Sequence, residues 1–105
     1  MNQKNRDDLI KFRQDRKWEE YHTELALVHA IGVEFGELSR LFQWGMKPSR
    51  ERVGEEIADM LIYLEYLAVK FDLNSEIIVE EKIEKNREKY FLGVDHAKRK
   101  GWNKP

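Results

Sequence analysis

Two pairs of acidic residues stand at helical spacing in stretches that are otherwise apolar. Glu34 and Glu37 form the first pair, and Glu56 and Asp59 form the second. Residues three apart in a helix leave the same face, with their Cβ atoms about 5–6 Å apart. Four carboxylates turned toward one interior would repel each other and resist desolvation. A divalent cation would relieve both effects, and such oxygen ligands favour Mg²⁺, with Mn²⁺ as the alternative ion.

The spacing alone says little, because acidic residues are abundant in this chain. With 20 acids in 105 residues, about four pairs at this spacing should arise by chance. A further pair, Glu81 and Glu84, lies mostly away from the apolar stripe of its helix, as a solvated pair would. The first two pairs differ from it because they share a helical face with apolar residues, where buried charges would need partners. The apolar positions that share their faces are Leu27, Ala30, Ile31, Leu38 and Leu41 for the first pair, and Val53, Met60 and Tyr63 for the second.

Composition predicts one domain, residues 1–105, of a protein that meets neither membrane nor nucleic acid. The net charge is −1, with acids and bases well mixed, so no global field attracts polyanions or a lipid surface. No apolar run approaches the length of a membrane span, and the polar N-terminus does not resemble a signal peptide. The chain has no cysteine, which excludes disulfides, thiolate metal sites and a cysteine nucleophile. We therefore expect a cytoplasmic protein.

The periodicity of apolar residues predicts an all-α fold with no strands. Thr23 and Ser49 are the expected N-caps of the two long helices. The four predicted helices cover about residues 5–17, 23–42, 49–71 and 75–90, the first belonging to an N-terminal helical segment, 1–17. Residues 93–105 form a basic tail, which we expect to be mobile or to dock on a neighbouring subunit. Four amphipathic helices with many aromatic residues indicate a bundle completed by self-association.

Several residues near the acids allow either a functional or a purely structural interpretation. Lys82 and Asn86 share a polar stripe on the last helix, which is either a solvated boundary or a strip that faces phosphate. Trp18 and His22 precede the second helix, where they either pack in the core or form a wall against which a planar base stacks. Trp44 follows the second helix and is either a second wall or a cap on the core.

Two rival site types are disfavoured by the sequence. Di-iron helical bundles need two Glu-x-x-His pairs on different helices. Glu19 and His22 supply one pair, but neither His29 nor His96 has a glutamate three residues before it. The glycines do not fit the phosphate-binding loop pattern GxxxxGK[ST] either. Any nucleotide chemistry would therefore depend on metal and helices.

Five motifs occur in order along the chain: Arg16-Lys-Trp18-Glu-Glu-Tyr-His22, Gly32-Val-Glu34-Phe-Gly-Glu37-Leu, Phe42-Gln-Trp44, Glu55-Glu56-Ile-Ala-Asp59-Met-Leu-Ile-Tyr63-Leu and Lys82-Ile-Glu-Lys-Asn86-Arg-Glu-Lys-Tyr90. Together they resemble the MazG-type all-α nucleoside triphosphate pyrophosphohydrolases, and most closely the small dCTP-pyrophosphatase branch. The resemblance covers about residues 12 to 90. It implies a dimer or a dimer of dimers, with sites lined by more than one subunit.

The resemblance also implies the reaction and the residues that carry it out. The reaction would convert a nucleoside triphosphate, with dCTP favoured, to the monophosphate and pyrophosphate, which removes unwanted nucleotides from the cellular pool. The four acids would ligate Mg²⁺, and Glu37 is our choice for the residue that orients the attacking water. The residues expected near the nucleotide are Trp18, His22, Trp44, Lys47, Tyr63, Lys82 and Asn86, with Lys47 and Lys82 assisting the leaving pyrophosphate.

The sequence departs from the family pattern at two places, and one alternative stays open. Thr23-Glu-Leu25 and Phe91 stand where many relatives have prolines, at pocket edges rather than at the acids. The sequence therefore constrains the preferred base less than it constrains the class of reaction. The alternative is a non-catalytic helical interaction or regulatory module of the same fold, in which the acids would be remnants or interface charges. The presence of all four acids at the family positions favours the enzyme.

Overall fold

The computed structural model describes residues 1–91. Within them the chain is all-helical, with four α-helices, two 3₁₀ turns and no strand, which confirms the predicted all-α class. The elements are α1 (Gln3–Asp15), η1 (Glu19–Tyr21), α2 (Glu24–Leu41), η2 (Gln43–Gly45), α3 (Arg50–Lys70) and α4 (Ser75–Lys89). The predicted basic tail, 93–105, lies outside the described residues.

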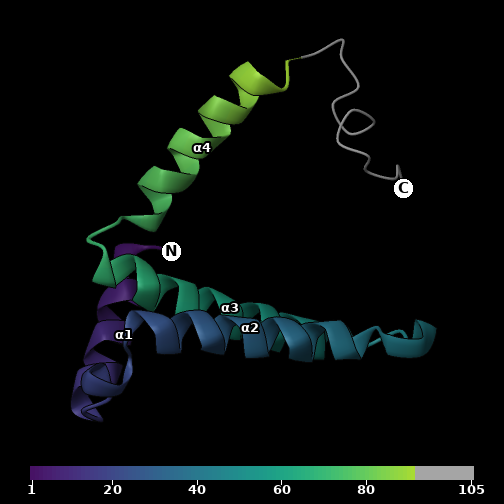
Figure 1. Ribbon diagram of the computed structural model, residues 1–105, viewed down its shortest axis with the longest axis horizontal. Helices are drawn as coiled ribbons and strands as arrows, with labels where there is room; N and C mark the ends of the chain where they lie inside the picture. The colour runs from purple at the N-terminus through teal and green to yellow at the C-terminus, as the bar shows by residue number, and fades with distance from the viewer. Residues whose placement is uncertain (92–105) are drawn as a thin grey trace. The chain divides into compact units, whose positions relative to one another are not determined.

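The chain divides into two compact units, one spanning Met1–Ser75 and one beginning at Glu76. In the first unit, α2 and α3 run antiparallel, side by side, and α1 crosses the end of this pair and contacts α3 (Figure 1). The described part of the second unit consists of α4 and the two residues that follow it. The prediction of one domain over residues 1–105 stays a prediction.

The helices of the α2–α3 pair begin where the sequence provides capping side chains. The backbone N–H of Ala26 donates to Thr23 Oγ1 at 3.1 Å, and that of Arg52 donates to Ser49 Oγ at 3.2 Å, so both predicted N-caps are confirmed. Each cap satisfies an N–H group that has no partner inside the helix. Between the helices, η2 reverses the chain with Gly45 in the left-handed region, at φ 71°. These local signals set the ends of the two helices that carry the acids.

A small core holds α1 against α3 at the end of the α2–α3 pair opposite η2 (Figure 1). Leu27 of α2 is only 1% exposed and Tyr66 of α3 is 3% exposed. The Tyr66 hydroxyl donates to the backbone carbonyl of Leu9 in α1 at 3.0 Å. Arg6 and the buried Glu65 form an ion pair at 3.5 Å across the same contact. A hydrogen bond and an ion pair therefore supplement apolar packing between α1 and α3.

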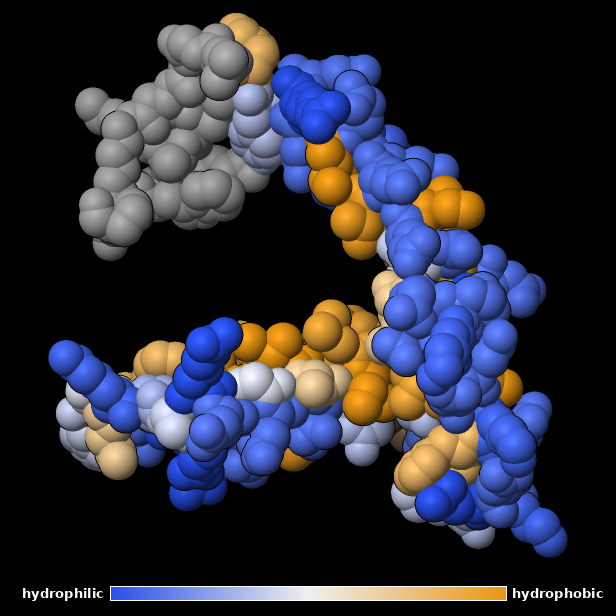
Figure 2. All heavy atoms as spheres, turned by 180° about the vertical axis from the view of Figure 1, so that it is seen from behind, coloured by the Kyte–Doolittle hydropathy of each residue, from blue (hydrophilic) through white to orange (hydrophobic). Residues whose placement is uncertain are grey.

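Apolar side chains remain on the surface of the α2–α3 pair, in stripes at helical spacing (Figure 2). Their spacing places each set on one face of its helix. The exposed residues are Leu25, Val28 and Phe35 on α2 and Ile57, Leu61 and Leu64 on α3. Exposed apolar surface of this extent is typical of a face that another protein surface covers. Separately, no helix in the described part of the chain is long and apolar enough to span a lipid bilayer.

Candidate functional site

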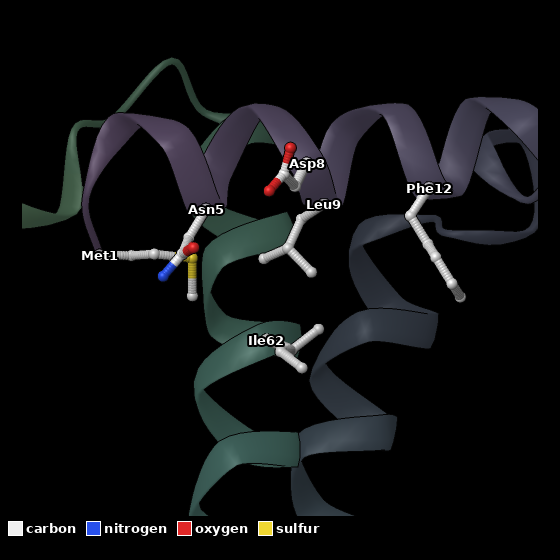
Figure 3. A pocket seen from close by; sticks show the side chains of 6 residues that line it. All are labelled: Met1, Asn5, Asp8, Leu9, Phe12 and Ile62. Carbon is white, nitrogen blue, oxygen red and sulfur yellow. The ribbon is translucent and has the colours of Figure 1, made fainter.

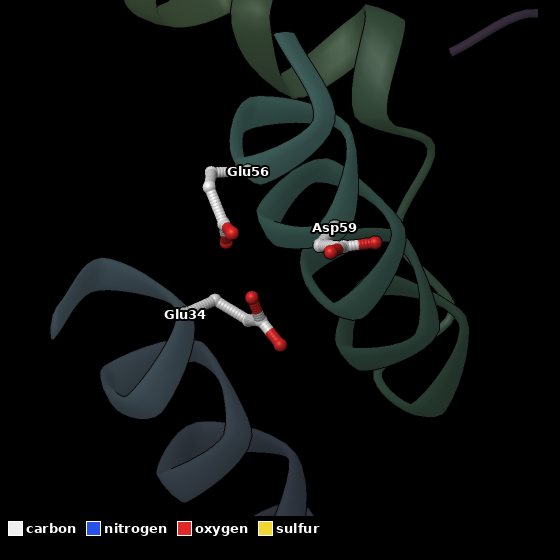
Figure 4. Close-up of side chains that lie close together, drawn as sticks. All are labelled: Glu34, Glu56 and Asp59. Atoms are coloured by element: carbon white, nitrogen blue, oxygen red, sulfur yellow. The ribbon is translucent and has the colours of Figure 1, made fainter. Parts of the chain in front are cut away.

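Three of the four predicted acids converge between α2 and α3. Glu34 lies on α2, and Glu56 and Asp59 lie one turn apart on α3. Because the two helices are antiparallel neighbours, these positions lie close together, and Glu34 and Glu56 point toward each other across the space between the helices, with the exposed Asp59 beside them (Figure 4). One oxygen of each residue lies within 4.8 Å of an oxygen of each other residue. We call these three carboxylates the acidic group.

The electrostatics of the acidic group are unfavourable without a cation. The pKa of Glu34 is raised above its usual value of 4.5 by burial, by the hydrogen bond that its protonated form makes with Glu56, and by repulsion from the neighbouring carboxylates. Oε2 of Glu56 is buried and has no hydrogen-bond partner. An unpartnered buried oxygen costs free energy unless a ligand satisfies it. The group therefore has both excess negative charge and unused ligand atoms.

A divalent metal ion fits the chemistry of this group. Carboxylate oxygens are the ligands that hard divalent cations select, and three converging carboxylates exceed what one or two side-chain cations would neutralise. The ion pairs that the structure describes in residues 1–91 involve none of the three residues. Glu34, Glu56 and Asp59 would thus serve as the protein ligands, with the unpartnered Oε2 of Glu56 among the donor atoms.

The fourth predicted acid, Glu37, lies one turn along α2 from Glu34 but is not part of the acidic group. Its side chain is exposed, although it is close enough for its charge to raise the pKa of Glu34. The i, i+3 spacing led us to expect both carboxylates to turn inward together. A helix advances 300° over three residues rather than a full turn, so one member of the pair can face the partner helix while the other turns toward solvent.

A cluster of aromatic rings surrounds His22 at the junction of η1 and α3. The ring centroid of His22 lies 6.2 Å from that of Trp18, 6.4 Å from Tyr63 and 5.1 Å from Tyr66. Burial lowers the pKa of His22 from its usual value of 6.5, and the charges of Arg13 and Lys70 lower it further. His22 is therefore neutral at physiological pH. Trp18, which is 42% exposed, and His22 thus share one cluster.

Two members of the acidic group and two rings of the aromatic cluster lie on one continuous stripe of α3. Glu56, Asp59, Tyr63 and Tyr66 follow each other at intervals of three or four residues. At 1.5 Å per residue, Asp59 and Tyr66 are about 10 Å apart along the helix. This is comparable to the span from the α-phosphate to the base of a nucleotide. The stripe can therefore present carboxylates at one end and aromatic rings at the other.

The remaining predicted residues lie outside these two groups. Trp44 belongs to η2 at the far end of the α2–α3 pair and is 89% exposed, and Lys47 follows it on the surface. Lys82 and Asn86 lie on α4 in the second unit, so their proposed approach to the triphosphate stays a prediction. The structure thus brings together Trp18, His22 and Tyr63, and separately the three carboxylates.

Sequence reasoning overlooked two residues of the aromatic cluster, Arg13 and Tyr66. Arg13 Cζ lies 4.7 Å from the centroid of the Tyr66 ring, and both side chains are buried. A signal for Tyr66 existed, because it stands seven residues after Asp59 and hence on the same helical face. Arg13 gave no comparable signal, because it sits in a mostly polar helix where an arginine is ordinarily solvated.

A hollow of about 300 Å³ lies where α1 crosses α3 (Figure 3). Its lining is mostly apolar, with Leu9, Phe12 and Ile62 among the contributing side chains and Asp8 as its one carboxylate. It contains no member of the acidic group. We therefore assign the chemistry to the α2–α3 interface rather than to this hollow.

Comparison with known proteins agrees with the resemblance noted in the sequence. The chain is 37% identical over 91 residues to human dCTP pyrophosphatase 1 and 37% identical over 92 residues to the bovine protein. Both matches cover 76% of this chain and 53% of the relative, so the chain spans about half the length of the curated relatives it matches. A pyrophosphatase from Archaeoglobus fulgidus of known crystal structure has 38% identity and a TM-score of 0.71, with coverage of 81% of this chain and 87% of the other.

The family model of the MazG-like family matches residues 29–104. This range includes the whole acidic group and most of the chain. The resemblance inferred from the ordered motifs is thereby confirmed, and this chain belongs to the MazG-like family.

Proposed function

We propose that this protein is a Mg²⁺-dependent nucleoside triphosphate pyrophosphohydrolase that favours dCTP. The observation that carries the proposal is the convergence of Glu34, Glu56 and Asp59, with an unpartnered buried oxygen, between two antiparallel helices. The names of the relatives support the reaction class and point to dCTP as the first substrate to test. Clearing unwanted nucleotides from the pool is the corresponding cellular role.

In this proposal each residue of the site has one task. The acidic group, with Glu34 as one member, holds the metal and through it the triphosphate. When bound, Mg²⁺ would supply positive charge beside the triphosphate oxygens and the leaving pyrophosphate. Glu37, exposed next to the acidic group, orients a water molecule and accepts its proton. The water oxygen bonds to the α-phosphorus while the bond from that phosphorus to the bridging oxygen breaks, which releases pyrophosphate.

The nucleoside end of the substrate is assigned to the aromatic cluster. Trp18 and Tyr63 offer ring faces and edges on which a base can stack, and neutral His22 adds no charge. Base–aromatic stacking contributes about 1–3 kcal/mol per base. Lys82, Asn86, Lys47 and Trp44 are proposed to approach the triphosphate, sugar or base from neighbouring segments.

We also propose that the protein acts as a homodimer or homotetramer. The exposed stripe on α3, which includes Leu61, and that on α2, which includes Phe35, leave the first unit with more apolar surface than a small monomer usually exposes. Self-association would bury these stripes and bring segments of another copy toward the site.

The experiment that tests the reaction class is a panel of canonical dNTPs and NTPs with Mg²⁺, with the products separated by anion exchange. We expect monophosphate and pyrophosphate, with dCTP turned over fastest. Diphosphate and phosphate would show that the attack site is wrong. No turnover with Mg²⁺ or Mn²⁺ would favour the non-catalytic interaction module instead.

A further inference from the structure

Arg13 is a buried cation, and two of its hydrogen-bond donor atoms have no acceptor among the described residues. It lies at the end of α1 and is 7% exposed. Its Nε and Nη1 atoms are buried and have no hydrogen-bond acceptor among residues 1–91. By contrast, Arg6, two turns earlier on the same helix, pairs with Glu65. Burying N–H groups without acceptors is costly, so a fold that retains Arg13 in this state has donors available for a ligand.

The surroundings of Arg13 contain rings but no described carboxylate partner. Its guanidinium lies over the face of Tyr66, at 4.7 Å from Cζ to the ring centroid. Nδ1 of the adjacent His22 is also buried without a partner. The contact with the face of the Tyr66 ring does not supply an acceptor to Nε or Nη1, whose N–H groups lie in the guanidinium plane. The missing partner is thus an acceptor that lies in that plane, as the edge of a flat heterocycle does.

The position of Arg13 matches where the base of a bound nucleotide would lie. Tyr66, which it overlies, is on the same stripe of α3 as Asp59, about 10 Å farther along the helix. A nucleotide whose triphosphate meets the acidic group would extend its base along this stripe. Trp18, which lies beside His22, would stack on the base face, and Arg13 would meet the base edge.

We propose that Arg13 is a specificity-determining residue that reads the base by donating hydrogen bonds to N3 and O2 of cytosine. This inference rests on the proposed function. A guanidinium has only donors and presents them in parallel pairs, and Nη1 belongs to its outer pair. Among the pyrimidines, only cytosine has two adjacent acceptors on its pairing edge. Thymine and uracil carry an N–H at position 3, which would oppose the donors of Arg13.

Binding of the base requires a covering side chain to move, because Nε and Nη1 are not open to solvent. His22 caps the C-terminal end of the short η1 turn. Its displacement breaks no hydrogen bond at Nδ1, because that atom has none. His22 is therefore the side chain expected to yield its place to the base edge.

The test measures binding and turnover separately, using the full chain with Mg²⁺. The binding probes are the non-hydrolysable α,β-imido analogues of dCTP, of dTTP and of 3-deaza-dCTP, which lacks the N3 acceptor. We expect the wild type to bind the cytosine probe about 10- to 100-fold more tightly than the other two. In Arg13→Lys, which keeps the charge but loses the paired donors, this ratio should fall to near one. Arg16→Lys is the matched control, because Arg16 already donates to the Phe12 carbonyl, and it should keep the wild-type ratio.

The outcomes separate this inference from the proposed reaction. If the preference for the cytosine probe depends on Arg13 but dCTP is not turned over, the role of Arg13 would be supported and the proposed reaction contradicted. Turnover with equal binding of the cytosine and 3-deaza probes by the wild type would overturn the role of Arg13, even if Arg13→Lys failed to fold. If Arg13→Lys keeps the wild-type ratio of probe binding but light scattering gives a changed mass, the acceptor of Arg13 is a side chain of a second copy and the role in base reading is overturned. Absence of binding and turnover would overturn both.

Discussion

At the scale of single residues, the site is defined by charges that the fold leaves uncompensated. Glu34 has a raised pKa because it is partly buried and faces Glu56 and Asp59 across the helix pair. Glu37, one turn away, is exposed and outside the acidic group. The two members of one acidic pair therefore have different environments and, in our proposal, different tasks.

The raised pKa of Glu34 predicts how the stability of the metal-free protein depends on pH. Because burial and repulsion raise the pKa of Glu34, the folded state at pH 7 carries a cost for this carboxyl that the unfolded state does not carry. As pH falls through the raised pKa toward 4.5, the folded state binds the proton first, so the contribution of Glu34 to the free energy of unfolding increases. Glu34→Gln should therefore raise the melting temperature of the metal-free protein at pH 7. Thermal unfolding monitored by circular dichroism would measure this, and a lower melting temperature would contradict the account.

Glu34→Gln should also remove most of the stabilisation that Mg²⁺ provides. A ligand that binds only the folded state at 100 times its dissociation constant stabilises it by about 2.7 kcal/mol. The wild type should show a rise in melting temperature of this origin at millimolar Mg²⁺. Glu51→Gln, which alters an exposed acid of α3 outside the group, should keep the rise. An equal rise in all three proteins would place the metal elsewhere.

Glu37→Gln should separate the orientation of water from the holding of metal. We expect turnover of dCTP to fall at least 100-fold, which is typical of the loss of a catalytic group, while the Mg²⁺-dependent rise in melting temperature persists. Loss of the rise together with turnover would instead make Glu37 a ligand. Retained turnover would remove Glu37 from the mechanism.

At the scale of elements, the sequence predicts the helices well because their signals are local. The caps Thr23 and Ser49 and the apolar period of each helix require no knowledge of the rest of the chain. The 3₁₀ turn η1 was not predicted, because its three residues, Glu19–Tyr21, have no distinctive spacing. The unequal exposure of Glu34 and Glu37 depends on how α2 is rotated against α3, which is a tertiary property.

The contact between α1 and α3 yields a prediction about one hydrogen bond. Tyr66→Phe removes the bond from the hydroxyl to the Leu9 carbonyl and leaves that carbonyl with one acceptor site unused. We expect a loss of about 1 kcal/mol in the free energy of unfolding. Urea unfolding would measure it, with Tyr21→Phe as the control at an exposed tyrosine. Equal effects of the two substitutions would show that this bond does not stabilise the contact.

At the scale of the whole molecule, α2 and α3 carry more apolar side chains than the small core buries. Leu27 is the one large side chain below 2% exposure among the described residues, whereas Leu61 in the middle of α3 is 53% exposed. Sequence periodicity predicts that both are apolar positions of a helix but cannot separate a core contact from a contact with another copy. For the same reason it predicts self-association without giving the number of subunits.

Leu61→Glu should disrupt self-association, because it places a charge in the centre of the exposed stripe on α3. Size-exclusion chromatography with light scattering should give a dimer or tetramer for the wild type and a 12.7 kDa particle for the variant. Glu55→Lys, at an exposed polar position of the same helix, is the control and should keep the wild-type mass. A wild-type mass of 12.7 kDa would contradict the proposed oligomer.

The most direct test of the proposed reaction is hydrolysis of dCTP in water enriched in ¹⁸O, with Mg²⁺ present and the products analysed by mass spectrometry. Attack at the α-phosphorus predicts one ¹⁸O atom in dCMP and none in the released pyrophosphate, with turnover lost in Glu56→Gln and retained in Glu51→Gln. Label in pyrophosphate, release of dCDP and phosphate, or undiminished turnover in Glu56→Gln would contradict the account.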